Sequence, residues 1–273
     1  MNFTIIGASG FIGRAMTLWL CEQGHSVFTP GRGDEMLFTR PLGHLIYAAG
    51  VTADFRSRPF DTLRAHTTLV ADILERASFD SLLYLSSARI YRHSEHTAED
   101  APVLLRSSDP EDLYDLTKMT AESMCATSRR DNARIARLTN VVGSDFGSDN
   151  FLYSLIREAC DRGTISLRTA LASEKDYVMI KDVVRLLAEI ALSGREMCYN
   201  VAAGRNLRHS DLTDAIASAT GAAVTVSPEA VLISMPVVSI RRVREEFGFL
   251  PSDVLPHISE LIGEYRSHRY VKG

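Results

Sequence analysis

The sequence opens with the feature that most restricts its fold: an apolar, β-favouring run, Phe3–Ile6, leads directly into a glycine turn. Glycine occupies positions 7, 10 and 13, and a helix-like pattern follows to residue 23. The first N–H groups of a helix are unpaired and lie at the positive end of its dipole, so such a turn can hold a pyrophosphate. The pattern predicts a strand–turn–helix unit that binds a dinucleotide. The alternative is a glycine turn that binds nothing.

Each glycine of the turn has its own expected part. Gly7 allows the turn, Gly10 lets the backbone approach the phosphates, and Gly13 lets the helix pack close to the strand. We expect the cofactor to contact the residues of this turn, namely Gly7, Ser9, Gly10, Phe11, Ile12 and Gly13.

Length and composition exclude several classes of protein. The chain has 273 residues, 45% hydrophobic and 23% charged, as in ordinary globular proteins. A net charge of -4 gives no basic face for nucleic acid. No apolar run approaches the roughly 20 residues that span a bilayer. The first expected strand begins near residue 2, which leaves no room for a secretory signal. We therefore expect a cytoplasmic protein with no membrane or nucleic-acid partner.

The cysteines and histidines predict neither a disulfide frame nor a metal site. The four cysteines are scattered and form no C-x-x-C pair, as expected of free thiols in a reducing compartment. His93 and His96 have metal-like spacing, but they lie in a polar segment without a nearby cysteine. We expect no metal.

Strand-like and helix-like segments alternate along the chain, which predicts an α/β fold: a Rossmann-type doubly wound parallel sheet with helices on both faces. The expected strands are Phe3–Ile6, Ser26–Thr29, a brief one at Met36–Phe38, His44–Tyr47, Leu82–Leu85, Arg134–Leu138 and Cys198–Val201. The expected helices are Phe11–Gln23, Asp61–Ala77, Pro110–Arg129, Phe151–Arg162, Lys181–Leu192 and His209–Thr220. From Gly221 onward, proline breaks, a short strand (Ala223–Val226) and two short helices predict a small added lobe.

A tyrosine and a lysine four residues apart, Tyr114 and Lys118, lie within the expected helix 110–129. Residues at this spacing share one helix face, so the phenol and the ammonium can reach one site. A tyrosine of ordinary pKa, about 10, is a poor acid–base group near neutrality. A neighbouring positive charge lowers that pKa. The pair predicts a proton-transfer site, and its alternative is a half-exposed tyrosine beside a surface lysine.

Two serines, Ser86 and Ser87, end the apolar strand 82–85. In an open parallel sheet, ligands bind beyond the carboxyl ends of the strands. A hydroxyl there can hydrogen-bond a substrate oxygen, although strand-end serines are more often caps.

Taken together, these motifs resemble the extended short-chain dehydrogenase/reductase family, especially its nucleotide-sugar epimerases, dehydratases and ketoreductases. The resemblance covers nearly the whole chain. Besides the glycine turn it includes segments 44–50, 86–91, 114–118, 137–143, 176–184, 199–202 and 247–251.

The resemblance implies roles for single residues. Ser87 is the expected catalytic serine and Tyr114 the acid–base tyrosine. Lys118 is expected to bind the nicotinamide ribose and to lower the pKa of Tyr114. Further cofactor contacts are expected at the end of the strand 44–47, from Ala48, Ala49 and Gly50.

Substrate contacts are expected around the same cleft. The candidates are Thr52, Ser87, Arg89, Asn140, Lys175, Arg205 and Arg241, with Arg208 and Arg242 as further cations for the two phosphates of a sugar nucleotide. His66, Ser144 and Lys175 stand where many relatives carry asparagine, proline and arginine.

The end of the second strand bears on the cofactor. Relatives that bind NAD carry an acid there that holds the adenosine ribose. Here Gly31 stands at that place and Arg32 follows, and an arginine can pair with a 2′-phosphate. The sequence favours NADP(H), whereas Asp34 or Glu35 in the ribose role keeps NAD(H) possible.

The expected function is an NAD(P)-dependent reduction of a keto group on a nucleotide-activated sugar. The dehydratases of the family carry Asp-Glu directly after the catalytic residue, and here Ala88 and Arg89 replace that pair. This argues against water elimination. An epimerase with tightly bound NAD and a non-catalytic, cofactor-sensing protein remain as alternatives.

The resemblance also implies how the chain is organised. The cofactor domain is expected over 1–145 and 178–203, and an interleaved substrate lobe over 146–177 and 204–273. The helices 61–77 and 110–129 are expected to pair with those of a second copy in a homodimer.

Overall fold

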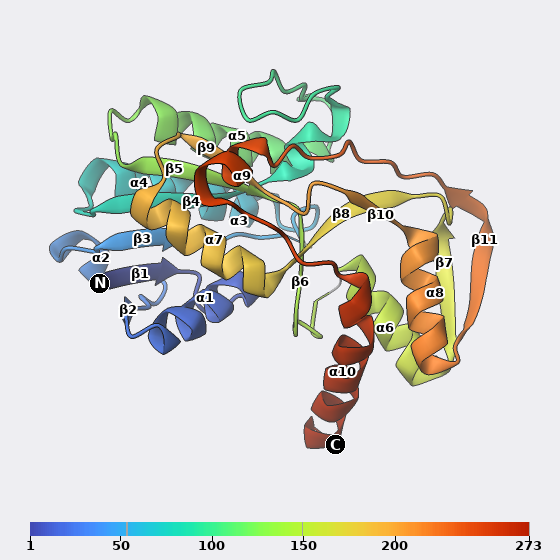
Figure 1. Ribbon diagram of the computed structural model, residues 1–273. Helices are drawn as coiled ribbons and strands as arrows, with labels where there is room; N and C mark the ends of the chain where they lie inside the picture. Colours follow the sequence, from blue (N-terminus) through green and yellow to red (C-terminus); the bar gives the residue numbers. More distant parts are fainter. Residues whose placement is uncertain (53, 149, 273) are drawn as a thin grey trace.

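A computed structural model describes residues 1–52, 54–148 and 150–272 (Figure 1). Its centre is a parallel six-stranded sheet of order β2-β1-β3-β4-β5-β9. These strands are β1 (Asn2–Ile6), β2 (Ser26–Phe28), β3 (His44–Tyr47), β4 (Ser81–Ser87), β5 (Ala133–Leu138) and β9 (Cys198–Val201). β2 lies on one side of β1 and β3 lies on the other. The strand order therefore reverses at β1, and sheets of this type bind ligands at such a point.

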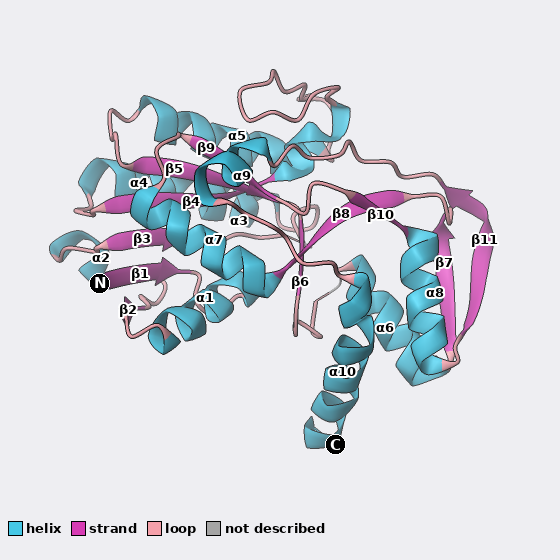
Figure 2. Cartoon of the chain, in the orientation of Figure 1, coloured by secondary structure: helices cyan, strands magenta, loops and turns pink. Residues whose placement is uncertain are grey.

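Helices cover both faces of this sheet (Figure 2). They are α1 (Phe11–Glu22), α2 (Met36–Thr39), α3 (Pro59–Leu63), a π-helical turn (Arg64–Thr68), α4 (Leu69–Arg76), α5 (Asp112–Thr127) and α7 (Ile180–Ser193). Met16 and Leu20 of α1 share a core with Leu187 of α7, whereas Ile73 of α4 shares another with Ala121 of α5. The doubly wound α/β architecture predicted from the sequence is confirmed.

The remaining elements form a second part with its own core. Its strands are β6 (Asn140–Val142), β7 (Thr164–Thr169), β8 (Glu174–Met179), β10 (Asn206–Arg208) and β11 (Ala223–Val231), in sheets of order β10-β8-β6 and β11-β7. Its helices are α6 (Phe151–Arg162), α8 (His209–Thr220) and α10 (Ile258–Lys272), and α9 (Arg241–Phe247) packs back on β9. Leu155, Ile165, Ile216 and Leu261 meet in this core.

The predicted elements differ from the structure at a few places. Segment 36–38, expected as a strand, is the short helix α2; the Asp34 side chain accepts the Met36 N–H at 2.9 Å, a local turn that competes with an extended strand. β11 runs on to Val231, beyond the predicted end at Val226. α10 has 15 residues rather than being short. Within the described residues, no helix combines the length and apolarity that a membrane crossing requires.

Candidate functional site

The glycine turn lies at the carboxyl end of β1, where its backbone is in close contact with β3. Gly7 has φ +88, and a Cβ there would lie 2.6 Å from the backbone nitrogen of Ala49. A Cβ on Gly13 would lie 2.2 Å from the Gly7 carbonyl oxygen. No side chain caps the N-terminus of α1 at Gly10. The turn therefore needs both glycines, and its free amides fit a cofactor pyrophosphate.

Ser87, Tyr114 and Lys118 meet at the carboxyl end of β4. The Ser87 side chain is near enough to Tyr114 to oppose the rise of its pKa, and Ser87 Oγ accepts the Arg89 N–H at 3.2 Å. Lys118 Nζ donates to the Leu85 carbonyl at 2.8 Å and lies 5.9 Å from the centre of the Tyr114 ring. The structure thus brings the three predicted catalytic residues together.

Burial dominates the acid–base properties of this group. It raises the pKa of Tyr114 to about 12, although Ser87 and Arg89 oppose the shift. It lowers the pKa of Lys118 to about 7, against the attraction of Glu122. The sequence predicted instead that Lys118 lowers the pKa of Tyr114. The structure differs because desolvation outweighs every nearby charge and because the ammonium is directed to the Leu85 carbonyl.

Gly50, which follows β3, lies close to Lys118. A Cβ on Gly50 would lie 3.0 Å from His66 Nε2 and 3.6 Å from Lys118 Nζ. Ala48 and Ala49 border Gly7 on the other side. The predicted contacts from this strand end therefore lie between the glycine turn and Lys118.

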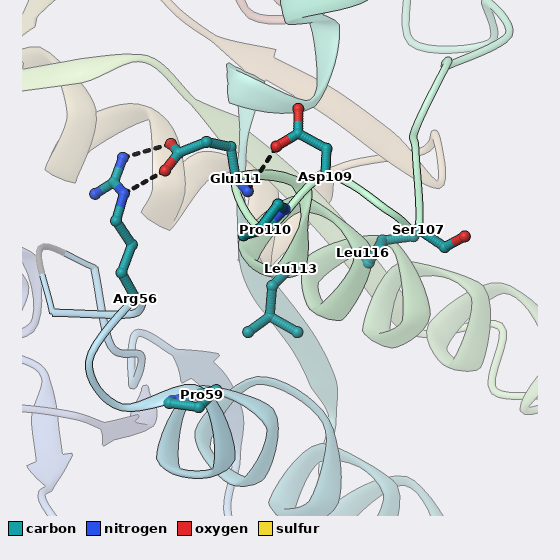
Figure 3. A pocket seen from close by; sticks show the side chains of 8 residues that line it. All are labelled: Arg56, Pro59, Ser107, Asp109, Pro110, Glu111, Leu113 and Leu116. Carbon is teal, nitrogen blue, oxygen red and sulfur yellow. Dashed lines mark hydrogen bonds and ion pairs between the residues drawn. The ribbon is translucent and has the colours of Figure 1, made fainter.

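Arg89 lies directly beside the tyrosine, but its charge is already paired. Its guanidinium donates to Asp115 at 2.9 Å and to Glu111 at 3.2 Å, and lies 5.6 Å from the Tyr114 ring centre. Glu111 also pairs with Arg56 (Figure 3). These two residues line a cavity of about 400 Å³ at the start of α5. Arg89 is thus fixed by α5 before any substrate binds.

Sequence reasoning missed Phe55, which lies in the segment after β3. Its side chain is buried, and its ring centre is 5.5 Å from that of Tyr114. The residue forms one wall of the tyrosine's surroundings. No sequence pattern marks it, because its neighbours in the chain are polar and the segment has no periodicity.

The predicted cations do not form one cluster. Lys175 is near Arg89, whose charge together with burial lowers the pKa of Lys175. Arg205 pairs instead with Asp253 at 2.9 Å, and Arg241 lines a separate cavity of about 390 Å³. Arg242 donates to the Cys198 carbonyl at 2.7 Å, which makes it a structural contact.

The remaining predicted contacts lie at the edges of the site. Asn140 donates to the Asp176 carbonyl at 2.8 Å. Thr52, Arg32 and Arg208 are exposed. The structure thus brings Ser87, Tyr114 and Lys118 together but leaves several predicted substrate contacts apart.

One group of potential metal ligands occurs among the described residues. His93, Asp109 and Asp112 place their ligand atoms within 4.8 Å of one another. However, the Arg92 guanidinium pairs with both carboxylates. The cluster is therefore an ion-pair network at the start of α5.

Comparisons with solved structures identify the same architecture. MoeE5 in complex with UDP-glucose and NAD has a TM-score of 0.81 and 18% sequence identity, over 98% of this chain and 99% of that one. RMD from Pseudomonas aeruginosa complexed with NADPH has a TM-score of 0.80 and 18% identity, over 98% and 100%. The Thermus thermophilus UDP-glucose 4-epimerase complex with NAD has a TM-score of 0.79 and 20% identity, over 97% and 99%.

At these identities the similarity shows the fold alone. No curated protein sequence matches this chain significantly. The model of the NAD dependent epimerase/dehydratase family, in contrast, matches residues 3–202, most of the chain. The match includes the glycine turn, Ser87, Tyr114 and Lys118, and it confirms the resemblance seen in the sequence. This chain therefore belongs to the NAD dependent epimerase/dehydratase family of enzymes.

Proposed function

We propose that this protein reduces a keto group on a nucleotide-activated sugar, with Tyr114 as the proton donor. The observation that carries the proposal is the placement of the Tyr114 and Ser87 side chains beside Lys118, at the same carboxyl end of the sheet as the glycine turn. A phenol whose pKa is raised to about 12 keeps its proton at neutral pH, as a donor must.

Each residue of the site has a separate role in the proposed reduction. A nicotinamide dinucleotide held by the glycine turn and Gly50 would supply the hydride. Tyr114 gives its proton to the carbonyl oxygen, so the C=O group becomes an alcohol. Ser87 hydrogen-bonds that oxygen and orients it toward the phenol. Lys118 holds the cofactor ribose beside Tyr114.

The substrate class rests on two kinds of support. The solved relatives contain nucleotide sugars, including UDP-glucose and UDP-glucuronic acid. In this chain Lys175, near Arg89, is a half-buried cation for which no carboxylate partner occurs among the described residues. An unneutralised cation beside the site fits one of the two phosphates of a sugar nucleotide.

We expect this protein to prefer NADPH to NADH. Arg32 is exposed next to Gly31, with no acid at the usual ribose position, so it can pair with a 2′-phosphate. Fluorescence titration of both cofactors tests this. Arg32→Ala should weaken NADPH binding by about tenfold or more while NADH binding is unchanged, the loss of one charge-assisted pair. Arg162→Ala, an exposed arginine at the end of α6, is the matched control.

An epimerase that keeps NAD tightly bound is the second candidate, because the same three residues could oxidise and then re-reduce a sugar. Purified protein that carries NAD and consumes no added NADPH would favour it. Cofactor binding without turnover on any keto-nucleotide-sugar would instead favour a sensing protein. Consumption of NADPH with one such substrate supports the reductase.

We further propose a homodimer built on α3 to α5. Phe60 and Leu63, both on α3, expose 73% and 45% of their surface at the start of this helical run, an apolar surface that a second copy could cover. Light scattering at micromolar concentration should give twice the chain mass, and Phe60→Asp should shift it toward the monomer. A monomeric wild-type protein would contradict this proposal.

A further inference from the structure

Arg89 belongs to the 3₁₀ helix Ala88–His93, which follows β4, and its guanidinium lies against two aromatic rings. The guanidinium carbon is 5.6 Å from the centre of the Tyr114 ring and 5.2 Å from that of Phe55. The Arg89 side chain still exposes 26% of its surface, so it is open to a ligand. A guanidinium keeps its charge throughout the physiological pH range. The structure therefore places a permanent, accessible cation beside the proposed proton donor.

One end of this guanidinium is held by α5, and one edge is free. Arg89 Nη1 donates to the Glu111 carbonyl at 3.0 Å and to the Asp115 carboxylate at 2.9 Å, and Nη2 donates to the Glu111 carboxylate at 3.2 Å. These bonds use three of the five N–H donors of an arginine. No acceptor for Nε–H or for the other Nη2 proton occurs among the described residues.

The free edge has the geometry of a carboxylate site. Nε and Nη2 project two parallel N–H bonds, and this fork matches the two oxygens of a carboxylate. The acids of α5 fix the position of the side chain, so little conformational entropy remains to be lost when a ligand binds. Glu111 is shared with Arg56, so its charge is divided between two guanidinium groups. Arg89 thus offers a preorganised pair of donors that a further anion can use.

A second cation, Lys175, comes from the other part of the molecule. It belongs to β8, and burial together with the Arg89 charge lowers the pKa of its ammonium. Like charges repel each other, and an anionic ligand beside both relieves that repulsion. Lys175 Nζ lies 5.6 Å from the centre of the Phe151 ring, whereas Arg89 lies against the Tyr114 ring. The two cations therefore face the same ligand from different sides.

We propose that Arg89 recognises a carboxylate on the sugar, so that the substrate is a nucleotide-activated uronic acid. The keto group must lie at the Tyr114 hydroxyl, so the part of the substrate beside Arg89 is the sugar, while Lys175 is left for a phosphate. Arg89 Nε–H and Nη2–H donate to the two carboxylate oxygens. This inference rests on the reductase function proposed above and names its substrate class.

Calorimetric titration with UDP-glucuronic acid and UDP-glucose tests the proposal, because these ligands differ only in one group, a carboxylate or a hydroxymethyl. Wild-type protein should bind the acidic ligand about 10- to 100-fold more tightly, as expected of hydrogen bonds to a charged group. Arg89→Met keeps an unbranched stem without the donors and should remove this preference, while UDP-glucose binds as before. Arg89→Lys keeps the charge without the parallel donors and should restore only part of it.

Titration with UDP alone separates the sugar from the phosphates. Arg89→Met should bind UDP as tightly as wild type, whereas Lys175→Met should bind it more weakly. Arg185→Met, at an exposed arginine of α7, is the matched control and should change none of these affinities. An Arg89→Met protein that loses affinity for UDP and for both sugar nucleotides by one common factor would assign Arg89 to the phosphates and overturn the proposal.

The wild-type protein decides the question even if Arg89→Met does not fold. Equal affinity for the acidic and the neutral ligand refutes the carboxylate site, and a preference that shrinks in Arg89→Lys supports it. If no uridine nucleotide binds, the thymidine pair is titrated with the same expectation, and absence of binding to both pairs also refutes the site. Protein that prefers the acidic ligand but oxidises no NADPH with any keto-nucleotide-sugar would refute the reductase function alone.

Discussion

Tyr114→Phe should lower kcat by about 10²- to 10⁴-fold, the range for losing a general acid. The variant keeps the ring that packs against Phe55 and His66 but removes the hydroxyl that we propose protonates the substrate oxygen. Cofactor binding should change little, because the glycine turn and Gly50 remain. Stopped-flow measurement of NADPH oxidation with a keto-nucleotide-sugar gives kcat, and fluorescence titration gives the cofactor Kd.

Tyr265→Phe is the matched control. This phenol lies in α10 and hydrogen-bonds Asp161, far from β4 in the chain's fold (Figure 1). It should retain wild-type turnover. A Tyr114→Phe enzyme with near-complete activity would remove the tyrosine from the mechanism, and with it the proposed role of Ser87.

Glu122→Gln should produce the largest loss of stability, about 3 to 5 kcal/mol, because it leaves a buried charge unpaired. Glu122 and Arg137 expose only 4% and 5% of their surface, and Arg137 Nη2 donates to the carboxylate at 2.6 Å. The carboxylate also accepts from Ser86, so one acid links α5 to β4 and β5. Urea unfolding followed by circular dichroism measures the change.

Two further variants test whether the loss of stability comes from the unpaired buried charge. Asp61→Asn removes a half-exposed ion pair with Arg58 and should cost less than about 1 kcal/mol. Glu122→Leu combined with Arg137→Met removes both buried charges and should recover much of the stability lost by Glu122→Gln. A Glu122→Gln protein within 1 kcal/mol of wild type would show that the Tyr91 hydroxyl at 2.6 Å and the Glu99 carbonyl at 3.1 Å, which already accept from Arg137, are enough to satisfy its charge.

The grouping of Ser87, Tyr114 and Lys118 was predictable because each residue is placed by the geometry of a single helix or strand. The glycine turn follows a strand and opens a helix, so its place at the sheet edge is fixed by connectivity. Tyr114 and Lys118 are four residues apart on one helix, and their common face follows from helix geometry. The strand–helix alternation predicted the sheet in the same way. The strand predicted at 36–38 was wrong because the segment is too short for periodicity to distinguish a strand from a helix, and a local hydrogen bond from Met36 N–H to Asp34 favours a turn there.

The environment of that group came only from the tertiary structure. Phe55 and the π-helical turn that carries His66 reach Tyr114 from sequence positions about 50 to 60 residues away, and no pattern relates them. Arg205 and Arg241 looked equivalent to Lys175 in the sequence, yet Arg205 pairs with Asp253 and Arg241 lines a different cavity.

The sequence by itself therefore determined the parallel sheet, the glycine turn after β1 and the grouping of Ser87, Tyr114 and Lys118 at one end of the sheet. These depend on spacing within single elements and on the order of elements along the chain. Only the tertiary structure decided the protonation of Tyr114 and Lys118, since their pKa values are governed by burial, and burial is a property of the packed chain rather than of neighbouring residues.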